Sequence, residues 1–268
     1  HEPNQGGLVQ TEQGGWYFFT HHGNGDWEGR CASLLPVTWV DGWPMLGKVG
    51  DDGVGTMVWS GRKPVQGGPL LVPQTDDDFS GPKLGVQWEW NYQPRADKWS
   101  LTERPGWLRL HAWKPLRPDD LKHAGNTLTQ RTLRTKRNVV TVQLDPSGMA
   151  DGQVAGLCHY NRNYATIAVR CDHGKLAIEA ARNQTILRGP VVEPKPLWLR
   201  SEWGLDGLCR FSYSTDGKSF ESLGEPYQFA WADYRGERIG LFSYNNADEA
   251  GYADFGSFTY RYESPLTR

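Results

Sequence analysis

Two carboxylates flank a tryptophan in a glycine-rich segment near the start of this 268-residue chain, and an arginine follows two residues later. The segment Gly23–Arg30 reads Gly-Asn-Gly-Asp-Trp-Glu-Gly-Arg. Paired carboxylic acids can donate and accept protons, while a guanidinium has fixed donors that fork to hydroxyl or carboxylate oxygens. Asp26 and Glu28 are therefore candidates for acid–base chemistry. The alternative is an ordinary solvated loop.

The elements that would position these residues are short strands. Gly7–Thr11 and Trp16–Thr20 are separated by a Glu-Gln-Gly-Gly turn, which predicts a hairpin, the unit of a propeller blade. His21 and His22 follow the aromatic strand and should point to opposite faces. They are either polar loop groups or ligands. Residues 29–47 predict a further strand, a turn and a short strand.

The rest of the chain has the rhythm of an antiparallel sandwich. Leu84–Trp90 alternates apolar and polar residues, and Arg104-Pro-Gly106 is a turn before another strand. Later strand candidates recur about every ten residues, broken by turn signals such as Asp216-Gly217. These candidates are 127–132, 139–144, 153–160, 165–169, 175–180, 197–202, 208–214, 239–244 and 255–260. The four tryptophans between residues 76 and 110 either pack between two sheets or line a binding surface.

Composition supports an all-β chain and excludes several classes of partner. Thirty-two glycines and seventeen prolines suit many short strands joined by tight turns. A net charge of −2 favours neither nucleic acid nor an anionic membrane, and no apolar run is long enough to span a bilayer. The four cysteines lack metal-ligand spacing and are expected to be buried thiols, although Cys158 and Cys171 could face each other across adjacent strands.

Several motifs carry a resemblance to a known family. Phe79-Ser-Gly, Gln87-Trp-Glu-Trp-Asn91 and Trp99-Ser-Leu-Thr-Glu-Arg-Pro-Gly106 stand in register before Leu-Arg-Leu110. This run resembles the opening of the C-terminal concanavalin-like sandwich of family-43 glycoside hydrolases, which include β-xylosidases and α-L-arabinofuranosidases. The likeness resumes at residues 126–132 and 239–245.

The N-terminal segment resembles the same family. Asn4-Gln-Gly-Gly-Leu-Val9, the aromatic strand, Gly29-Arg30 and Pro36-Val-Thr-Trp-Val-Asp-Gly-Trp-Pro44 are similar to the last blades of its five-bladed catalytic propeller. The resemblance implies an all-β chain: a partial propeller over residues 1–66, then a two-sheet antiparallel concanavalin-like sandwich over residues 67–268.

The resemblance also implies an inverting exo-hydrolase that releases arabinofuranosyl or xylosyl residues from plant cell-wall polysaccharide. Inverting enzymes hold two carboxyl groups about 6.5–9.5 Å apart, and the family places its acid, base and tuning carboxylates on earlier blades. We therefore expect no catalytic residue in this chain, which would be inactive alone and would partner the N-terminal propeller half. The alternative is a non-catalytic carbohydrate-binding or structural sandwich.

The family places a sugar-binding arginine of the −1 subsite at the position of Arg30. Gln5 falls where relatives carry a polar residue or histidine beneath the active site, often near a central calcium, so His1 and Gln5 are metal candidates. One of the paired histidines, taken as His21, should point into the propeller funnel. Trp27 is either a sugar platform or a cover for the blade.

The sandwich has its own candidates. Asp78 and Asp254 could hold a structural calcium between the first and last strands, or cap turns. The loop 245–251 is expected at the active-site rim, with Asn245 and Asn246 contacting sugar, or else to be a solvated hairpin loop. No organic cofactor is expected. The location stays open, with an extracellular or periplasmic one favoured over a cytoplasmic one.

Overall fold

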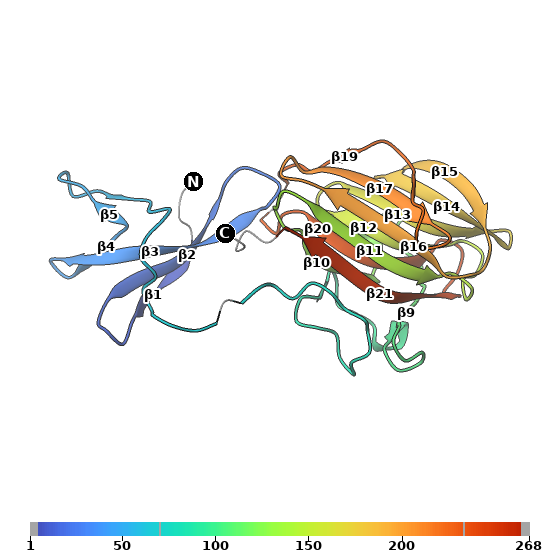
Figure 1. Ribbon diagram of the computed structural model, residues 1–268, viewed down its shortest axis with the longest axis horizontal. Coiled ribbons are helices and arrows are strands. Elements are labelled where there is room, and N and C mark those ends of the chain that lie inside the picture. The colour runs from blue at the N-terminus through green and yellow to red at the C-terminus, as the bar shows by residue number, and fades with distance from the viewer. Residues whose placement is uncertain (1–4, 70, 233, 264–268) are drawn as a thin grey trace.

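The computed structural model describes residues 5–69, 71–232 and 234–263 of the chain. It is built almost entirely of antiparallel strands, in a small N-terminal sheet and a larger two-sheet body (Figure 1). The small sheet lies at one end of the larger body, as Figure 1 shows. The all-β class predicted from composition and strand rhythm is confirmed.

The N-terminal sheet, here called the blade, contains four strands in the order β1-β2-β3-β4. The strands are β1 Gly6–Gln10, β2 Trp16–Gly23, β3 Arg30–Val40 and β4 Trp43–Leu46. Four strands are the content of one propeller blade. Each connection between neighbours is short, and Asp41-Gly42 joins β3 to β4 with both residues at positive φ, as a tight hairpin turn requires.

A connector leads from the blade to the larger body. The two-stranded pair β5 Lys48–Val49 and β6 Gly55–Thr56 follows the blade directly. The chain joins the body where Thr75 Oγ1 donates to the carbonyl oxygen of Tyr260 and Asp77 pairs with Phe258.

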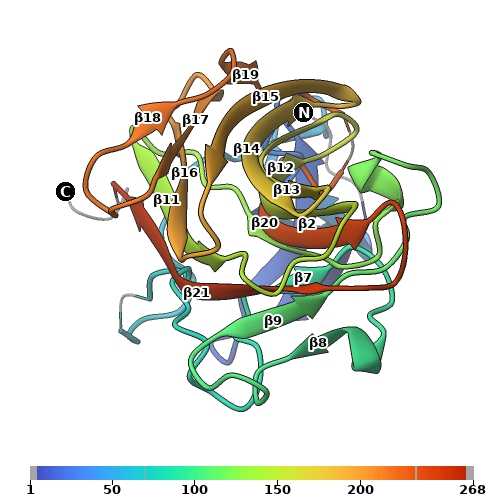
Figure 2. The same ribbon diagram turned by 90° about the vertical axis from the view of Figure 1, so that its right-hand side faces the viewer.

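The larger body, here called the sandwich, has two antiparallel sheets packed face to face (Figure 2). One sheet has the order β15-β14-β13-β12-β20-β10-β7, and the other β18-β17-β16-β11-β21-β9-β8 with β19 paired to β17. The strands are β7 Glu89–Trp90, β8 Trp99–Ser100, β9 Leu108–His111, β10 Thr127–Arg131, β11 Asn138–Asp145, β12 Gln153–Tyr160, β13 Tyr164–Asp172, β14 Lys175–Arg182, β15 Thr185–Val192, β16 Leu197–Trp203, β17 Leu208–Ser214, β18 Glu221–Ser222, β19 Tyr227–Gln228, β20 Arg238–Asn245 and β21 Tyr252–Tyr262.

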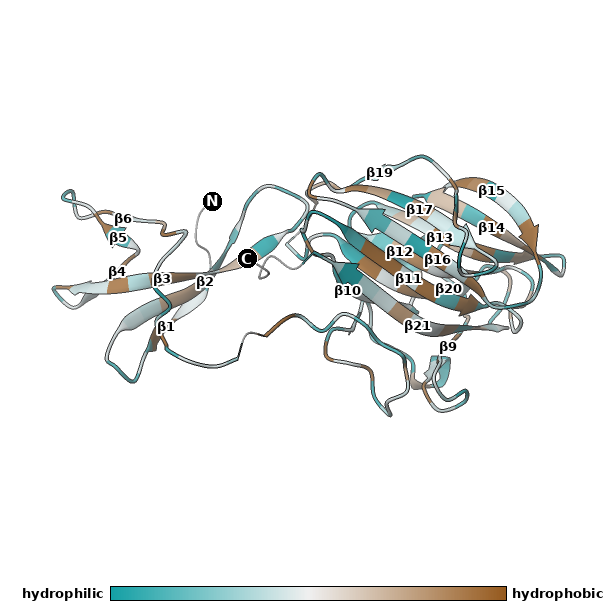
Figure 3. Ribbon diagram, in the orientation of Figure 1, coloured by the Kyte–Doolittle hydropathy of each residue, from teal (hydrophilic) through white to brown (hydrophobic). Residues whose placement is uncertain are grey.

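The main core lies between the two sheets. Alternating residues of β11 and β16, such as Val140, Val142 and Leu199, are fully buried there, and Figure 3 shows the corresponding bands of apolar residues. A second apolar cluster covers the outer face of the sheet that contains β12, where the short 3-10 helix η2 Leu121–His123 packs against Cys158 and Phe242.

The structure differs from the sequence expectations at several places, of which two are instructive. Leu84–Trp90 forms a strand only over its last two residues. Strand β15, which contains Pro190, was not among the predicted strands. Proline is accepted there because β15 is the edge of its sheet and needs no donor on its outer side.

The cysteines are free thiols. Cys158 lies opposite Thr166 rather than Cys171, and the two belong to different apolar clusters, so the suggested facing pair was wrong.

The helical segments that the structure describes are two 3-10 turns of three residues, and neither is long enough to cross a membrane.

Candidate functional site

Three of the predicted sugar or metal contacts meet in one groove between the blade and the sandwich. Gln5, His21 and Arg30 line this groove, whose volume is about 780 Å³. Phe19 and Val9 of the blade form its apolar part, and Arg131 and Tyr234 close it from the sandwich side. His1 lies outside the described residues.

Strand register explains how residues far apart in sequence reach the groove. His21 pairs with Ala32, and Gly23 pairs with Arg30, so alternate side chains of β2 and β3 share one face of the blade. His21 Nε2 lies 3.4 Å from Gln5 Oε1 on this face. His22 points to the other face, where its Nδ1 lies 2.5 Å from Ser33 Oγ and its ring meets Trp59 edge-on. The expectation that the two histidines separate is confirmed by this geometry.

Arg30 is held by its backbone while its side chain stays exposed. Its N–H donates to the carbonyl oxygen of Tyr234 at 2.9 Å, and its own carbonyl accepts from Arg131 Nη2 at 3.2 Å. Its guanidinium lies 5.5 Å from the centre of the Tyr234 ring. Among the described residues no carboxylate forms an ion pair with Arg30, so its donors face the open groove.

Residues 24–29, between β2 and β3, are here called the docking loop. The two carboxylates of this loop, Asp26 and Glu28, pair with the sandwich and not with the groove. Arg134 Nη1 lies 2.8 Å from Asp26 and 2.6 Å from Glu28. Burial lowers the pKa of Arg134, but the hydrogen bond and charge of Glu28 outweigh this effect and raise it. Because both carboxylates pair with one guanidinium of the sandwich, Asp26 and Glu28 are not arranged as an acid–base pair across a substrate.

Trp27 anchors the docking loop in the sandwich. Its side chain is only 1% exposed and meets Phe229 edge-on, at 5.3 Å between ring centres. Its carbonyl oxygen accepts from the N–H of Glu237 at 2.8 Å. Neither face of the indole is open to a sugar. The structure thus excludes a role for Trp27 as a sugar platform. Trp27 instead packs the docking loop against the sandwich.

Two glycines allow the backbones to touch at this junction. A Cβ on Gly29 would lie 2.4 Å from the nitrogen of Gly236, and one on Gly236 would lie 2.3 Å from the oxygen of Glu28. Both have positive φ, at 72° and 69°. Any larger residue would push the docking loop away from the sandwich.

Asn245 and Asn246 lie at the other end of the sandwich, which corrects the expected position of their loop. Strand β20 begins at Arg238, next to the docking loop, and Asn245 ends it seven residues later, roughly 24 Å away at about 3.4 Å per residue. The Asn245 amide is buried and makes four hydrogen bonds to backbone groups. It donates to the carbonyl oxygens of Asp151 and Ala250 and accepts from two N–H groups of its own loop. Asn246 exchanges two hydrogen bonds with Asp119.

Asp78 and Asp254 do not share a site. Asp254 is 2% exposed, and its oxygens accept from Arg109 at 2.7 and 2.9 Å and from Arg104 at 2.9 Å. Asp78 is exposed and caps the turn at Ser80. Its neighbour Asp77 pairs with Phe258, four residues or roughly 13 Å along β21 from Asp254. The proposed calcium pair was wrong, because two guanidinium groups already neutralise Asp254.

The groove also lacks the donors that calcium needs. Calcium takes six to eight oxygen ligands, chiefly carboxylates, whereas Gln5 offers one amide oxygen and His21 a nitrogen. Among the described residues no group of three or more His, Cys, Asp or Glu side chains could hold a metal ion. The residues present do not fit a calcium ion by themselves.

The groove residues Tyr234 and Arg131 were missed by sequence reasoning. Both lie on the sandwich, about 100 to 200 residues from Arg30 in the chain. No motif linked them to the blade, and only the tertiary fold brings them together.

The comparisons with known proteins agree with this architecture. A family described as "Beta xylosidase C-terminal Concanavalin A-like domain" matches residues 76–261. A β-xylosidase of Formosa agariphila is 38% identical, over 98% of this chain and 48% of its own length. An α-L-arabinofuranosidase of Bacteroides ovatus is also 38% identical, over 38% of this chain and 20% of its own.

The solved structures extend the likeness over the blade. A family-43 protein of Bacillus licheniformis aligns with 97% of this chain and 53% of its own at a TM-score of 0.79 and 26% identity. A bifunctional protein of Bacteroides eggerthii aligns with 98% of this chain and 34% of its own length, at a TM-score of 0.78 and 29% identity. The chain spans about half the length of the curated relatives it matches. The chain therefore belongs to glycoside hydrolase family 43, with a blade that precedes the concanavalin-like sandwich of that family.

Proposed function

We propose that this chain forms one wall of the active site of an inverting exo-glycosidase that releases xylosyl or arabinofuranosyl residues from plant cell-wall polysaccharide. The acid and base carboxylates come from propeller blades outside this chain. The observation that carries the proposal is Arg30, whose backbone is fixed by the sandwich while its guanidinium faces an open groove without an ion-pair partner among the described residues. A guanidinium in that state can fork to sugar hydroxyls and orient a carboxylate.

The exposed face of the blade supports a partner of this kind. Phe19 is 58% exposed, and Leu34 and Val40 on the same face are 37% and 46% exposed. Isolated blades leave such apolar faces open, and neighbouring blades cover them. The partner in the proposal is therefore the N-terminal part of the propeller.

In this proposal the sandwich supports the site instead of binding the polysaccharide. Stacking sugars requires exposed, coplanar aromatic rings, yet Trp88 and Trp203 are buried in the core. Trp231 is the one exposed tryptophan among those the structure describes in the sandwich. This favours a structural role over a carbohydrate-binding one.

A fusion tests the proposal. In the fusion, this chain replaces the matching half of the Formosa agariphila relative and is joined to that relative's remaining propeller blades. The fusion should hydrolyse an aryl xyloside or aryl arabinofuranoside, whereas this chain alone should not. Arg30→Ala in the fusion should lower kcat/KM at least about a hundredfold, with Arg30→Lys in between. Arg117→Ala, which changes an exposed sandwich arginine, is the matched control.

Two outcomes would remove the proposal. Turnover by the isolated chain would show that its own groups suffice for catalysis. Equal kcat/KM in the parent fusion and the Arg30→Ala variant would remove Arg30 from the site.

A further inference from the structure

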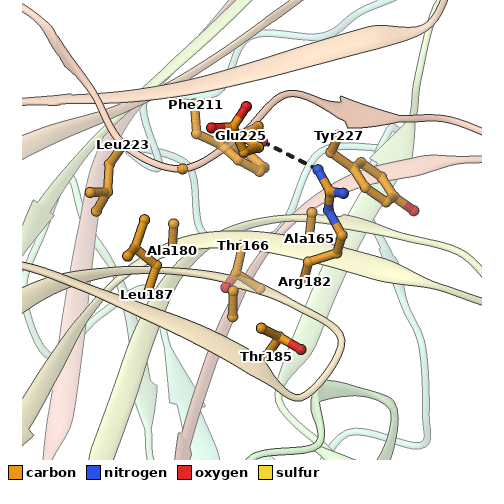
Figure 4. Close-up of a pocket in the computed structure, with 12 residues that line it drawn as sticks. Ala165, Thr166, Ala180, Arg182, Thr185, Leu187, Phe211, Leu223, Glu225 and Tyr227 are labelled. Atoms are coloured by element: carbon orange, nitrogen blue, oxygen red, sulfur yellow. Dashed lines mark hydrogen bonds between the residues drawn. The ribbon is translucent and has the colours of Figure 1, made fainter.

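A second cavity lies at one edge of the sandwich, away from the groove. It has a volume of about 290 Å³ and opens between the two sheets at the edge formed by β14 and β15. Figure 4 shows Ala165, Ala180 and Leu187 on one side, facing Phe211 and Leu223 on the other. Further in, the same strands form the closely packed core, so an opening of this size beside that core needs an explanation.

Small residues leave the space open. Ala180 lies between Ile167 and Leu187 of the neighbouring strands, Ala165 lies beside Arg182, and Gly224 of the cavity lining has no side chain. A Cβ on Gly224 would lie only 3.2 Å from the Cβ of Ala180. Filling such a void with apolar atoms normally stabilises a protein, at about 25 cal/mol per Å² of surface removed from water.

One cation stands at the mouth of the cavity. Arg182 Nη2 donates to the carbonyl oxygens of Pro226 at 2.5 Å and Glu225 at 3.4 Å, which fixes the guanidinium beside the ring of Tyr227. No carboxylate forms an ion pair with Arg182 among the described residues. In Figure 4 the Glu225 side chain extends away from the guanidinium.

This combination specifies the chemistry of a ligand. The inner surface is apolar and bordered by Phe211, so it suits a planar ring, whose face or edge can pack on an aromatic side chain. Nη2 is engaged by the two carbonyl oxygens, so Nε or Nη1 can donate a single charge-assisted hydrogen bond to one oxygen of a carboxylate. A volume of 290 Å³ lies just below the range for drug-sized ligands, about 300–1,000 Å³, and therefore suits a smaller molecule.

We propose that this cavity is a binding site for a small aromatic monocarboxylic acid, with the ring between the sheets and the carboxylate on Arg182. The site is separate from the groove that holds Arg30, and its existence does not depend on the glycosidase activity proposed above.

Cinnamate and benzoate are the probes, titrated into the whole 268-residue chain and followed by calorimetry and saturation-transfer NMR. Saturable one-to-one binding is expected, with the uncharged cinnamamide bound at least tenfold more weakly. Arg182→Gln should weaken cinnamate binding at least tenfold and bring the acid and the amide to similar affinity. Ala180→Leu should abolish binding of both by filling the cavity. Arg210→Gln is the control. Arg210 is exposed on β17 and does not line the cavity, so this variant should bind cinnamate as the parent does.

Circular dichroism and thermal unfolding identify any variant that fails to fold, and Arg182→Gln is expected to fold because Arg182 lies on the surface. The absence of saturable cinnamate binding to the parent chain would overturn the site. Unchanged binding in Arg182→Gln would overturn the carboxylate assignment, and unchanged binding in Ala180→Leu would overturn the location.

Discussion

The backbone N–H of Arg30 donates a 2.9 Å hydrogen bond to the carbonyl oxygen of Tyr234, which joins the start of β3 to the sandwich. The two residues are more than 200 positions apart in the chain. The bond lies beside the close contact of Gly29 with Gly236 and the buried ring of Trp27. The candidate sugar-binding arginine is therefore positioned by the second part of the chain as well as by its own strand.

Replacing Gly236 by alanine should separate the docking loop from the sandwich. The new Cβ would lie 2.3 Å from the Glu28 oxygen, and the residue has a φ of 69°. We expect a loss of about 2 kcal/mol or more in the free energy of unfolding, with faster hydrogen exchange in β2 and β3. The control is Gly174→Ala, which has a φ of 71° but open space around it. An equal loss of unfolding free energy in both variants would show that the contact with Glu28 does not contribute to stability.

Trp27→Ala should be among the most damaging single changes in the N-terminal part. A buried tryptophan replaced by alanine typically costs about 3–5 kcal/mol, and Trp27 is 1% exposed between the blade and the sandwich. Trp43→Ala removes a blade tryptophan that is 73% exposed and should change stability by less than about 0.5 kcal/mol. Urea unfolding measures both. Similar effects of the two changes would contradict the anchoring role.

His159 predicts a loss of stability in acid. It is fully buried, with Nε2 2.8 Å from Ser201 Oγ, and burial lowers its pKa from 6.5 to about 3. The unfolded chain binds a proton below about pH 6.5, while the folded chain resists it until about pH 3. The free energy of unfolding therefore falls across that interval, by roughly 4–5 kcal/mol at about 1.4 kcal/mol per pH unit.

His159→Phe should remove this part of the pH dependence, as measured by urea unfolding at pH 7, 5.5 and 4. His173→Gln is the control, because the His173 side chain is 94% exposed. A pH dependence that is the same in the parent and in His159→Phe would rule out His159 as its source.

Asp254 should act through its arginines and not through a metal. Asp254→Asn removes the carboxylate that Arg104 and Arg109 share. Arg104 keeps Asp145 and Arg109 keeps Glu103, so we expect the free energy of unfolding to fall by less than about 3–5 kcal/mol, the cost of a buried charge left without a partner. Asp78→Asn should leave stability nearly unchanged, since Asp78 is exposed. Thermal unfolding with calcium or a chelator should give the same melting temperature in each case. A calcium-dependent rise that Asp254→Asn abolishes would restore the metal site.

Local sequence patterns predicted most of the sandwich. Strands β12 and β17 begin and end where alternation and turn signals placed them, at Gln153–Tyr160 and Leu208–Ser214. Period-two burial is a local property, because each residue's face depends only on its neighbours in the strand. The position of Gln5, His21 and Arg30 on one face of the blade follows from the same alternation.

What the sequence alone could not decide was which side chains remain free. Asp26 and Trp27 looked available for chemistry because their own segment is rich in glycine, yet Arg134 and Phe229 of the sandwich engage them. Asn245 looked like a rim residue until the direction of β20 placed it at the far end. Each outcome depends on contacts between segments tens to hundreds of residues apart. Such contacts form only when two sheets and the blade pack together, so no local pattern carries them.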